Sequence, residues 1–223
     1  MTEPEESVLE RAPEPTLRAL RPKEGPGGDA EELPLLRRTI ELQVFARDGH
    51  HVVIGTLHDE RPWASGRAGP RDVHQMELGI VVRCTDLVIV DAAASMGHYP
   101  HPECTGIEPS FSELIGLSVG RGYTRAVQDR FGRERGCSHL EFLARALGPV
   151  VIQAVTAAGA RQMEDGKAGT LAGGGLEWLT NTCHIWAEDG IGPQKLAAGW
   201  RAGLGEYPAP SLVEIRRRGE HPG

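Results

Sequence analysis

The stretch from Ser138 to Arg161 constrains the fold of this chain more than any other, because its pattern requires a long helix with one buried face. Ser138 and Glu141 stand three positions apart, as in a capping box that satisfies backbone N–H groups at a helix start. Apolar residues recur at steps of three and four and predict a core-facing stripe, made of Leu140, Leu143, Leu147, Val150, Val151 and Ala154. Pro149 removes one backbone hydrogen bond, so we expect a kink there.

A cysteine and a histidine flank the expected start of this helix. Cys137 directly precedes Ser138, and His139 directly follows it. Unpaired N–H groups and the helix dipole give a helix N-terminus partial positive charge, which favours a thiolate over a thiol. The start of the helix is therefore a candidate position for a nucleophile or a metal ligand.

Four apolar runs that precede the helix predict an antiparallel sheet. They lie at 40–44, 51–57, 76–82 and 87–93, with turn residues between neighbouring runs. The economical arrangement is a meander, in which Asp59 at the end of the second strand and His74 at the start of the third meet at one edge. Further helices are expected at 110–116 and 123–131. The predicted fold class is α+β, an antiparallel β-meander packed against a helical segment with one long kinked helix.

Composition divides the chain into three parts. Residues 1–37 are rich in Glu and Pro and have few apolar anchors. Such a segment buries too little apolar surface to offset the backbone entropy of ordering, about 1–2 kcal/mol per residue, so we expect a disordered leader. Residues 38–205 form a single predicted domain, which includes a last strand within 176–186. Residues 206–223 are expected to be a solvated tail.

Charge and cysteine spacing argue against several classes of protein. The 24 basic and 31 acidic side chains give a formal charge of −7. No stretch combines basic and aromatic residues as a nucleic-acid groove does. No apolar run of about 18 residues stands out, and no targeting segment is recognisable. We therefore expect a cytoplasmic protein with a small-molecule substrate or ligand, without nucleic-acid or membrane partners, and with a homo-oligomer left open. The four cysteines form no C-x-x-C pair, unlike a disulfide framework or zinc ribbon.

Several short motifs follow one another along the chain. They are His74-Gln75-Met76, Tyr99-Pro100 with Cys104, Phe111 to Gly116, Gly120-Arg121-Gly122-Tyr123, Gly136-Cys137-Ser138-His139-Leu140 and Cys183-His184. With this ordered set the chain resembles, over about residues 38–200, the bacterial family catalogued as domain of unknown function 2889. Members usually have an aspartate where this chain has Gln75, and an acidic residue three positions after the histidine, whereas Glu141 follows His139 by two. The resemblance implies no established activity.

The residue types at these motifs favour a metal site. Three thiolates and an imidazole suit zinc or a similar divalent ion, and the candidate ligands are Cys104, Cys137, His139 and Cys183. His74 is the candidate acid/base, and Glu141 is a second candidate for that role. This hypothesis predicts a metal-dependent lyase or hydrolase that acts on a small molecule.

Two alternatives stay open at this point. In the first, the enzyme is metal-free, Cys137 is the nucleophile, and His139 or His74 is the general acid/base. In the second, the protein is a non-catalytic module whose apolar pocket binds a small ligand or a partner protein. The glycines at 173–175 do not form a phosphate-binding loop, which argues against a nucleotide cofactor.

Overall fold

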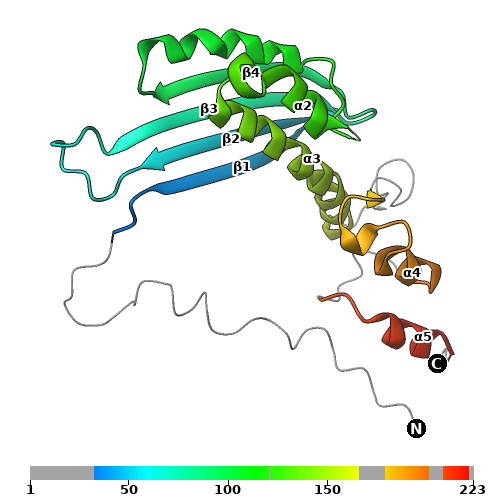
Figure 1. The fold of residues 1–223 in the computed structure, drawn as a ribbon. Coiled ribbons are helices and arrows are strands. Elements are labelled where there is room, and N and C mark those ends of the chain that lie inside the picture. Colours follow the sequence, from blue (N-terminus) through cyan, green and yellow to red (C-terminus); the bar gives the residue numbers. More distant parts are fainter. Residues whose placement is uncertain (1–32, 121, 166–178, 201–207, 221–223) are drawn as a thin grey trace, which may run out of the picture.

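A four-stranded antiparallel sheet forms the centre of the molecule (Figure 1). The computed structural model describes residues 33–120, 122–165, 179–200 and 208–220. The strands are β1 (Arg37–Arg47), β2 (His50–Glu60), β3 (Asp72–Arg83) and β4 (Ile89–His98), and they pair in sequence order. The predicted meander and the α+β fold class are thereby confirmed. Almost all of the expected leader lies outside the described residues.

The helical elements follow the sheet in sequence. They are η2 (Pro102–Leu114), α2 (Tyr123–Phe131), η3 (Arg133–Arg135), α3 (Ser138–Glu164), η5 (His184–Trp186), α4 (Ile191–Ala197) and α5 (Leu212–Glu220), where η marks a 3-10 helix. The helix expected at 123–131 and the long helix are confirmed, whereas the helix expected at 110–116 overlaps the end of the longer η2, which stops at Leu114. The long helix continues through Pro149, and the kink at this residue stays a prediction.

One face of the sheet carries the hydrophobic core. Side chains alternate along a strand, and in β2 the buried positions are every second residue, from His51 to Asp59. Val53 and Leu57 from this strand pack with β3 residues and with Leu140, Leu143 and Leu147 of α3 in one core cluster. The helix α3 therefore packs over β2 on this face of the sheet.

Gly55 lets α3 approach the sheet closely. A Cβ atom at this position would lie 3.0 Å from Leu42 Cδ2 and 3.1 Å from Leu147 Cδ2. A side chain here would force the neighbouring leucines to move. The absence of a side chain at Gly55 thus helps to fix the height of the helix above β2.

Two details of the helix start and of the C-terminal region differ from expectation. Ser138 is already helical, and the carbonyl of Cys137 accepts the Glu141 N–H at 2.8 Å, so the cap position is one residue earlier than predicted.

The last strand expected within 176–186 is wrong for its described part, which contains η5 instead of a strand. Asn181 has a φ of 62°, which interrupts an extended backbone. The helix α5 also occupies part of the expected tail.

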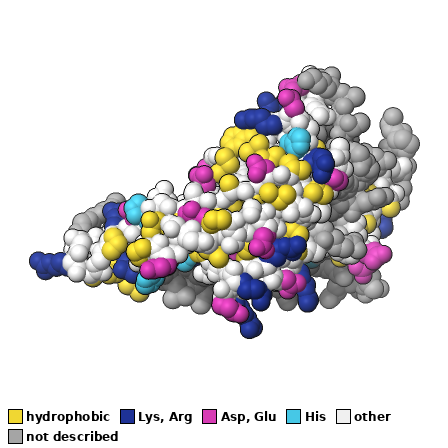
Figure 2. Space-filling view, turned by 90° about the horizontal axis from the view of Figure 1, so that it is seen from above, with side chains coloured by type: hydrophobic (Ala, Val, Ile, Leu, Met, Phe, Trp, Pro, Cys, Tyr) yellow, Lys and Arg dark blue, Asp and Glu magenta, His cyan; other side chains and the backbone are white. Residues whose placement is uncertain are grey.

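The segment Ser138–Gln162 of α3 is long and apolar enough to cross a membrane, with a mean hydropathy of 1.4 in its best window. The sequence prediction had not identified such a run. The core helix of an α+β domain meets the same criterion, and α3 contacts β1, β2 and β3. On the face seen in Figure 2, hydrophobic, acidic and basic side chains are interspersed. The cytoplasmic location stays a prediction.

Candidate metal centre

Three neighbouring strands place a row of polar side chains at one end of the core face. The register pairs Asp59 of β2 with Arg38 of β1 and with His74 of β3. Asp59 is the last buried position in the alternating pattern of β2, two residues beyond Leu57. Directly paired residues of adjacent strands point to the same face, so the three side chains meet beside the apolar core.

The start of α3 adds a second imidazole to this row. His139 lies in the first turn of the helix, four residues before Leu143, whose side chain packs at Gly55. Residues four apart lie on the same face of a helix, so His139 faces the sheet one turn before Leu143. Its ring lies against that of His74 in a tilted arrangement, with centroids 3.9 Å apart and planes inclined by 32°.

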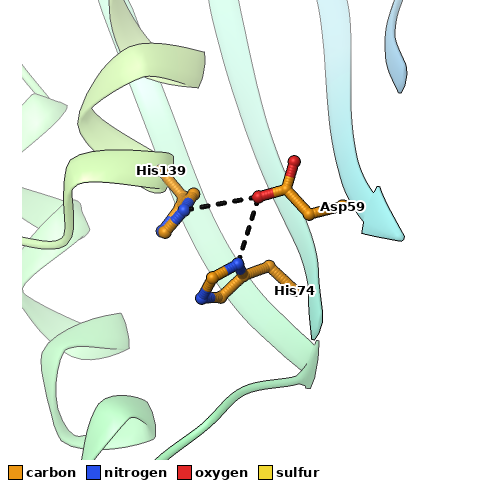
Figure 3. A group of neighbouring side chains, drawn as sticks. All are labelled: Asp59, His74 and His139. Atoms are coloured by element: carbon orange, nitrogen blue, oxygen red, sulfur yellow. Dashed lines mark hydrogen bonds and ion pairs between the residues drawn. The ribbon is translucent and has the colours of Figure 1, made fainter. Parts of the chain in front are cut away.

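Asp59, His74 and His139 form a group of metal-ligand type (Figure 3). One ligand atom from each residue lies within 4.8 Å of the other two. Oδ2 of Asp59 is 3.1 Å from Nδ1 of His74 and 3.5 Å from Nε2 of His139. It is the one group of three or more such ligands in the described parts of the chain.

Arg38 holds the carboxylate of this group. Its Nε donates to Oδ1 of Asp59 at 2.7 Å, and its Nη2 donates to Oδ2 at 2.8 Å. These bonds outweigh the cost of burial and lower the pKa of Asp59, with further contributions from His74 and His139. Asp59 is only 2% exposed. The buried carboxylate is therefore ionised at neutral pH and fixed in orientation.

The environment of His139 favours the neutral imidazole. Burial lowers its pKa, and the nearby His74 and Arg38 lower it further, while Asp59 acts in the opposite direction. A neutral imidazole has the free lone pair that metal coordination requires. The second ring nitrogen, Nδ1, lies 3.7 Å from the sulfur of Cys137.

The structure does not bring all of the predicted site residues together. His74 and His139 belong to the group, and Cys137 touches it through His139, but no cysteine is a member. Cys104 is half-buried and packs against the hydrophobic core. Cys183 is exposed and lines a cavity of about 1100 Å³ beside Tyr123.

Glu141, the second acid/base candidate, is buried and interacts with Arg145. The distance between Nε of Arg145 and Oε1 of Glu141 is 2.8 Å. This nitrogen has no partner in hydrogen-bond geometry, so the contact is an ion pair without a hydrogen bond. The carboxylate of Glu141, two residues after His139, is thus already paired with Arg145, one turn further along α3.

The sequence reasoning did not assign a role to Asp59 and did not consider Arg38. The meander predicted that Asp59 and His74 meet at one edge, and the register confirms this. Arg38 stands at the start of β1, where the same register would have aligned it with Asp59. A fully paired hairpin between β1 and β2 was therefore the signal that could have identified it.

Comparison with known protein families identifies a match to this chain. The family described as protein of unknown function (DUF2889) matches residues 36–153. The match includes Asp59, His74, Cys137 and His139 and ends before Cys183. No curated protein and no solved structure matches the chain.

Proposed function

This chain belongs to the DUF2889 family of proteins of unknown function, and we propose that it binds a divalent metal ion through Asp59, His74 and His139 for chemistry on a small molecule. The proposal replaces the shell of three cysteines and one histidine with two histidines and one aspartate. The observation that carries it is the convergence of three ligand atoms at a partly buried point.

The distances between the donor atoms support coordination. Metal–ligand bonds of about 2.1 Å, spanning the 3.1 and 3.5 Å separations, give angles at the ion of roughly 95° and 113°. Octahedral and tetrahedral sites need angles in this range. The two separations that involve Asp59 are therefore compatible with coordination of one ion.

The donor set suits zinc and also ferrous iron. Two imidazoles and one carboxylate with an open position are found in zinc hydrolases and in non-haem iron enzymes. Zinc is our first choice, because a bound zinc ion acts as a Lewis acid on a carbonyl or hydroxyl oxygen, as a lyase or hydrolase requires. In this scheme Arg38 orients Asp59, and Cys137 contacts the ring nitrogen of His139 that faces away from the ion.

Equilibrium dialysis of the metal-free full-length chain against zinc, ferrous, cobalt or manganese ions, followed by elemental analysis, tests the proposal. We expect about one ion per chain and at least a hundredfold weaker binding in Asp59→Asn and His139→Gln. Asp72→Asn is the matched control, because Asp72 bonds His58 outside the group at 2.7 Å. Equal binding by all variants, or no binding, would contradict the proposal.

A second candidate function uses the same residues without a metal. The Cys137 sulfur, the His139 ring and the Asp59 carboxylate form a chain, with 3.7 Å between Sγ and Nδ1 and 3.5 Å between Nε2 and Oδ2. Nucleophile, base and orienting carboxylate are arranged in this order in cysteine hydrolases. Cys137 would then be the nucleophile and His139 the general base.

The two candidates require different tautomers of His139. A metal site needs an unprotonated Nε2 and an Nδ1–H that points to Cys137, whereas the nucleophilic site needs an Nε2–H that donates to Asp59. Alkylation with iodoacetamide distinguishes them. The nucleophilic site predicts that Cys137 in metal-free protein reacts at least tenfold faster than Cys183, and that His139→Gln removes this difference.

A further inference from the structure

The carboxylate of the proposed metal centre, and that of Glu141 nearby in the sequence, already have cationic partners. Asp59 accepts two hydrogen bonds from Arg38, at 2.7 and 2.8 Å. Glu141, one turn into α3, forms an ion pair with Arg145 at 2.8 Å. Asp59 is the one carboxylate in the group itself. The charge of that carboxylate is therefore balanced before any ion arrives.

A divalent ion would leave this centre with an excess of positive charge. The ion brings two charges, Arg38 adds one, Asp59 removes one, and neutral imidazoles contribute none, so the net charge is plus two. Uncompensated charge in a partly buried site is unfavourable. A second anion in the coordination shell would remove part of this excess.

Arg38 also has a donor nitrogen that its contact with Asp59 does not use. Asp59 uses Nε and Nη2 of the guanidinium, and Nη1 is not part of that contact. The Arg38 side chain is 37% exposed. A planar guanidinium, with several donors in a fixed geometry, is the side chain best suited to bind a carboxylate.

We infer that the substrate of this centre is a small carboxylate, whose oxygen fills the open coordination position while its charge is shared between the ion and Arg38. The inference rests on the proposed metal site, and it names the substrate class of that site. It follows from the Arg38–Asp59 contact, since an unpaired aspartate would have left the centre less positive.

Calorimetric titration of the zinc-loaded full-length chain tests the inference. The probes are glycolate, its neutral isostere glycolamide, and inorganic phosphate, each also titrated into metal-free protein. We expect glycolate to bind zinc-loaded protein at least about tenfold more tightly than it binds metal-free protein. We also expect zinc-loaded protein to bind glycolate at least about tenfold more tightly than glycolamide. Bound zinc is measured after each titration to exclude removal of the metal.

Variants of Arg38 provide a second readout. Arg38→Gln should reduce the preference for glycolate over glycolamide about tenfold, and Arg38→Lys, which keeps the charge, should retain most of it. Only samples with full zinc occupancy are compared, because Arg38 also positions Asp59. The comparison of probes on the unaltered protein does not depend on either variant.

The outcomes separate the inference from the proposed function. Equal binding of glycolate and glycolamide to zinc-loaded protein would overturn the inference and leave the metal site standing. Tighter binding of phosphate than of glycolate would overturn the assignment to a carboxylate. A chain that binds no metal would overturn the proposed function and the inference together.

Discussion

Two polar residues are buried on the same face of β2, and their surroundings are opposite. Asp59, 2% exposed, contacts Arg38, His74 and His139. His51, 6% exposed at the other end of the strand, has an Nδ1 atom without a hydrogen-bond partner in the described part of the protein. Burial of a polar group alone does not indicate a functional site. The stronger indication is that several polar groups converge on one atom, as they do on Oδ2 of Asp59.

The cross-strand neighbours explain this difference. The register places Asp59 between Arg38 and His74, whereas it places His51 between Ala46 and Val82. Apolar neighbours remove water from Nδ1 of His51 without replacing its hydrogen bond, and burial lowers the pKa of the ring. Polar neighbours turn the same kind of position into a hydrogen-bonded cluster at Asp59, the candidate metal centre.

The largest expected effect comes from removing the charge of Asp59 at its end of β2. Asp59→Asn should weaken metal binding at least a hundredfold, and it should also destabilise the metal-free protein by roughly 2–3 kcal/mol, because Arg38 loses its charged partner. We place the cost below that of a fully buried pair because Arg38 is 37% exposed. Urea denaturation of the metal-free variant measures it. A loss no larger than that of Asp72→Asn would show that the Arg38–Asp59 contact adds little stability.

His139→Gln separates binding from stability at the same end. The variant should bind metal at least a hundredfold more weakly, yet change the free energy of unfolding of the metal-free protein by less than about 1 kcal/mol. Only a half-buried ring at the helix start is altered. Calorimetric metal titration and urea denaturation of the same preparation give both values. A large stability loss with unchanged metal affinity would mean that His139 is a packing residue.

A smaller effect is expected at Cys137. If its sulfur orients the His139 ring, Cys137→Ala should weaken metal binding about tenfold, and Cys137→Ser, which keeps a hydrogen-bonding atom, should weaken it less. Cys183→Ser serves as the control, because Cys183 lies outside the group. Equal metal affinities for Cys137→Ala and the control would show that the thiol does not position the ring.

The smallest effect concerns the isolated histidine. Because the pKa of His51 is lowered in the folded protein, the unfolded chain takes up a proton first as the pH falls below about 6.5. Folding stability therefore decreases from pH 7 towards pH 5. His51→Leu should remove this part of the pH dependence and raise the free energy of unfolding by about 1 kcal/mol at pH 5.

Urea denaturation at both pH values measures this effect. His50→Gln, a change to the partly exposed neighbour that bonds the carbonyl of Asp48, is the control. An unchanged pH dependence in His51→Leu would mean that the buried ring is solvated or paired in solution, and the contrast between the two ends of β2 would then disappear.

The sequence was sufficient to predict the strands, the turns between them and the sheet edge where Asp59 meets His74. Alternation and turn residues determine a meander, and a meander determines which strand ends are neighbours. It could not predict that His139 lies over this edge, because the placement of α3 depends on its packing at Gly55. Cysteine chemistry favoured sulfur ligands, but the residues that gather by tertiary packing have nitrogen and oxygen donors.

Zinc K-edge X-ray absorption on the zinc-loaded full-length chain tests the central claim most directly. A centre made of Asp59, His74 and His139 predicts nitrogen and oxygen neighbours at about 2.0–2.2 Å, without a sulfur shell at about 2.3 Å. The same spectrum should be absent from Asp59→Asn, which would hold no stoichiometric zinc. A sulfur shell, or an unchanged spectrum in Asp59→Asn, would place the ion elsewhere and contradict the assignment.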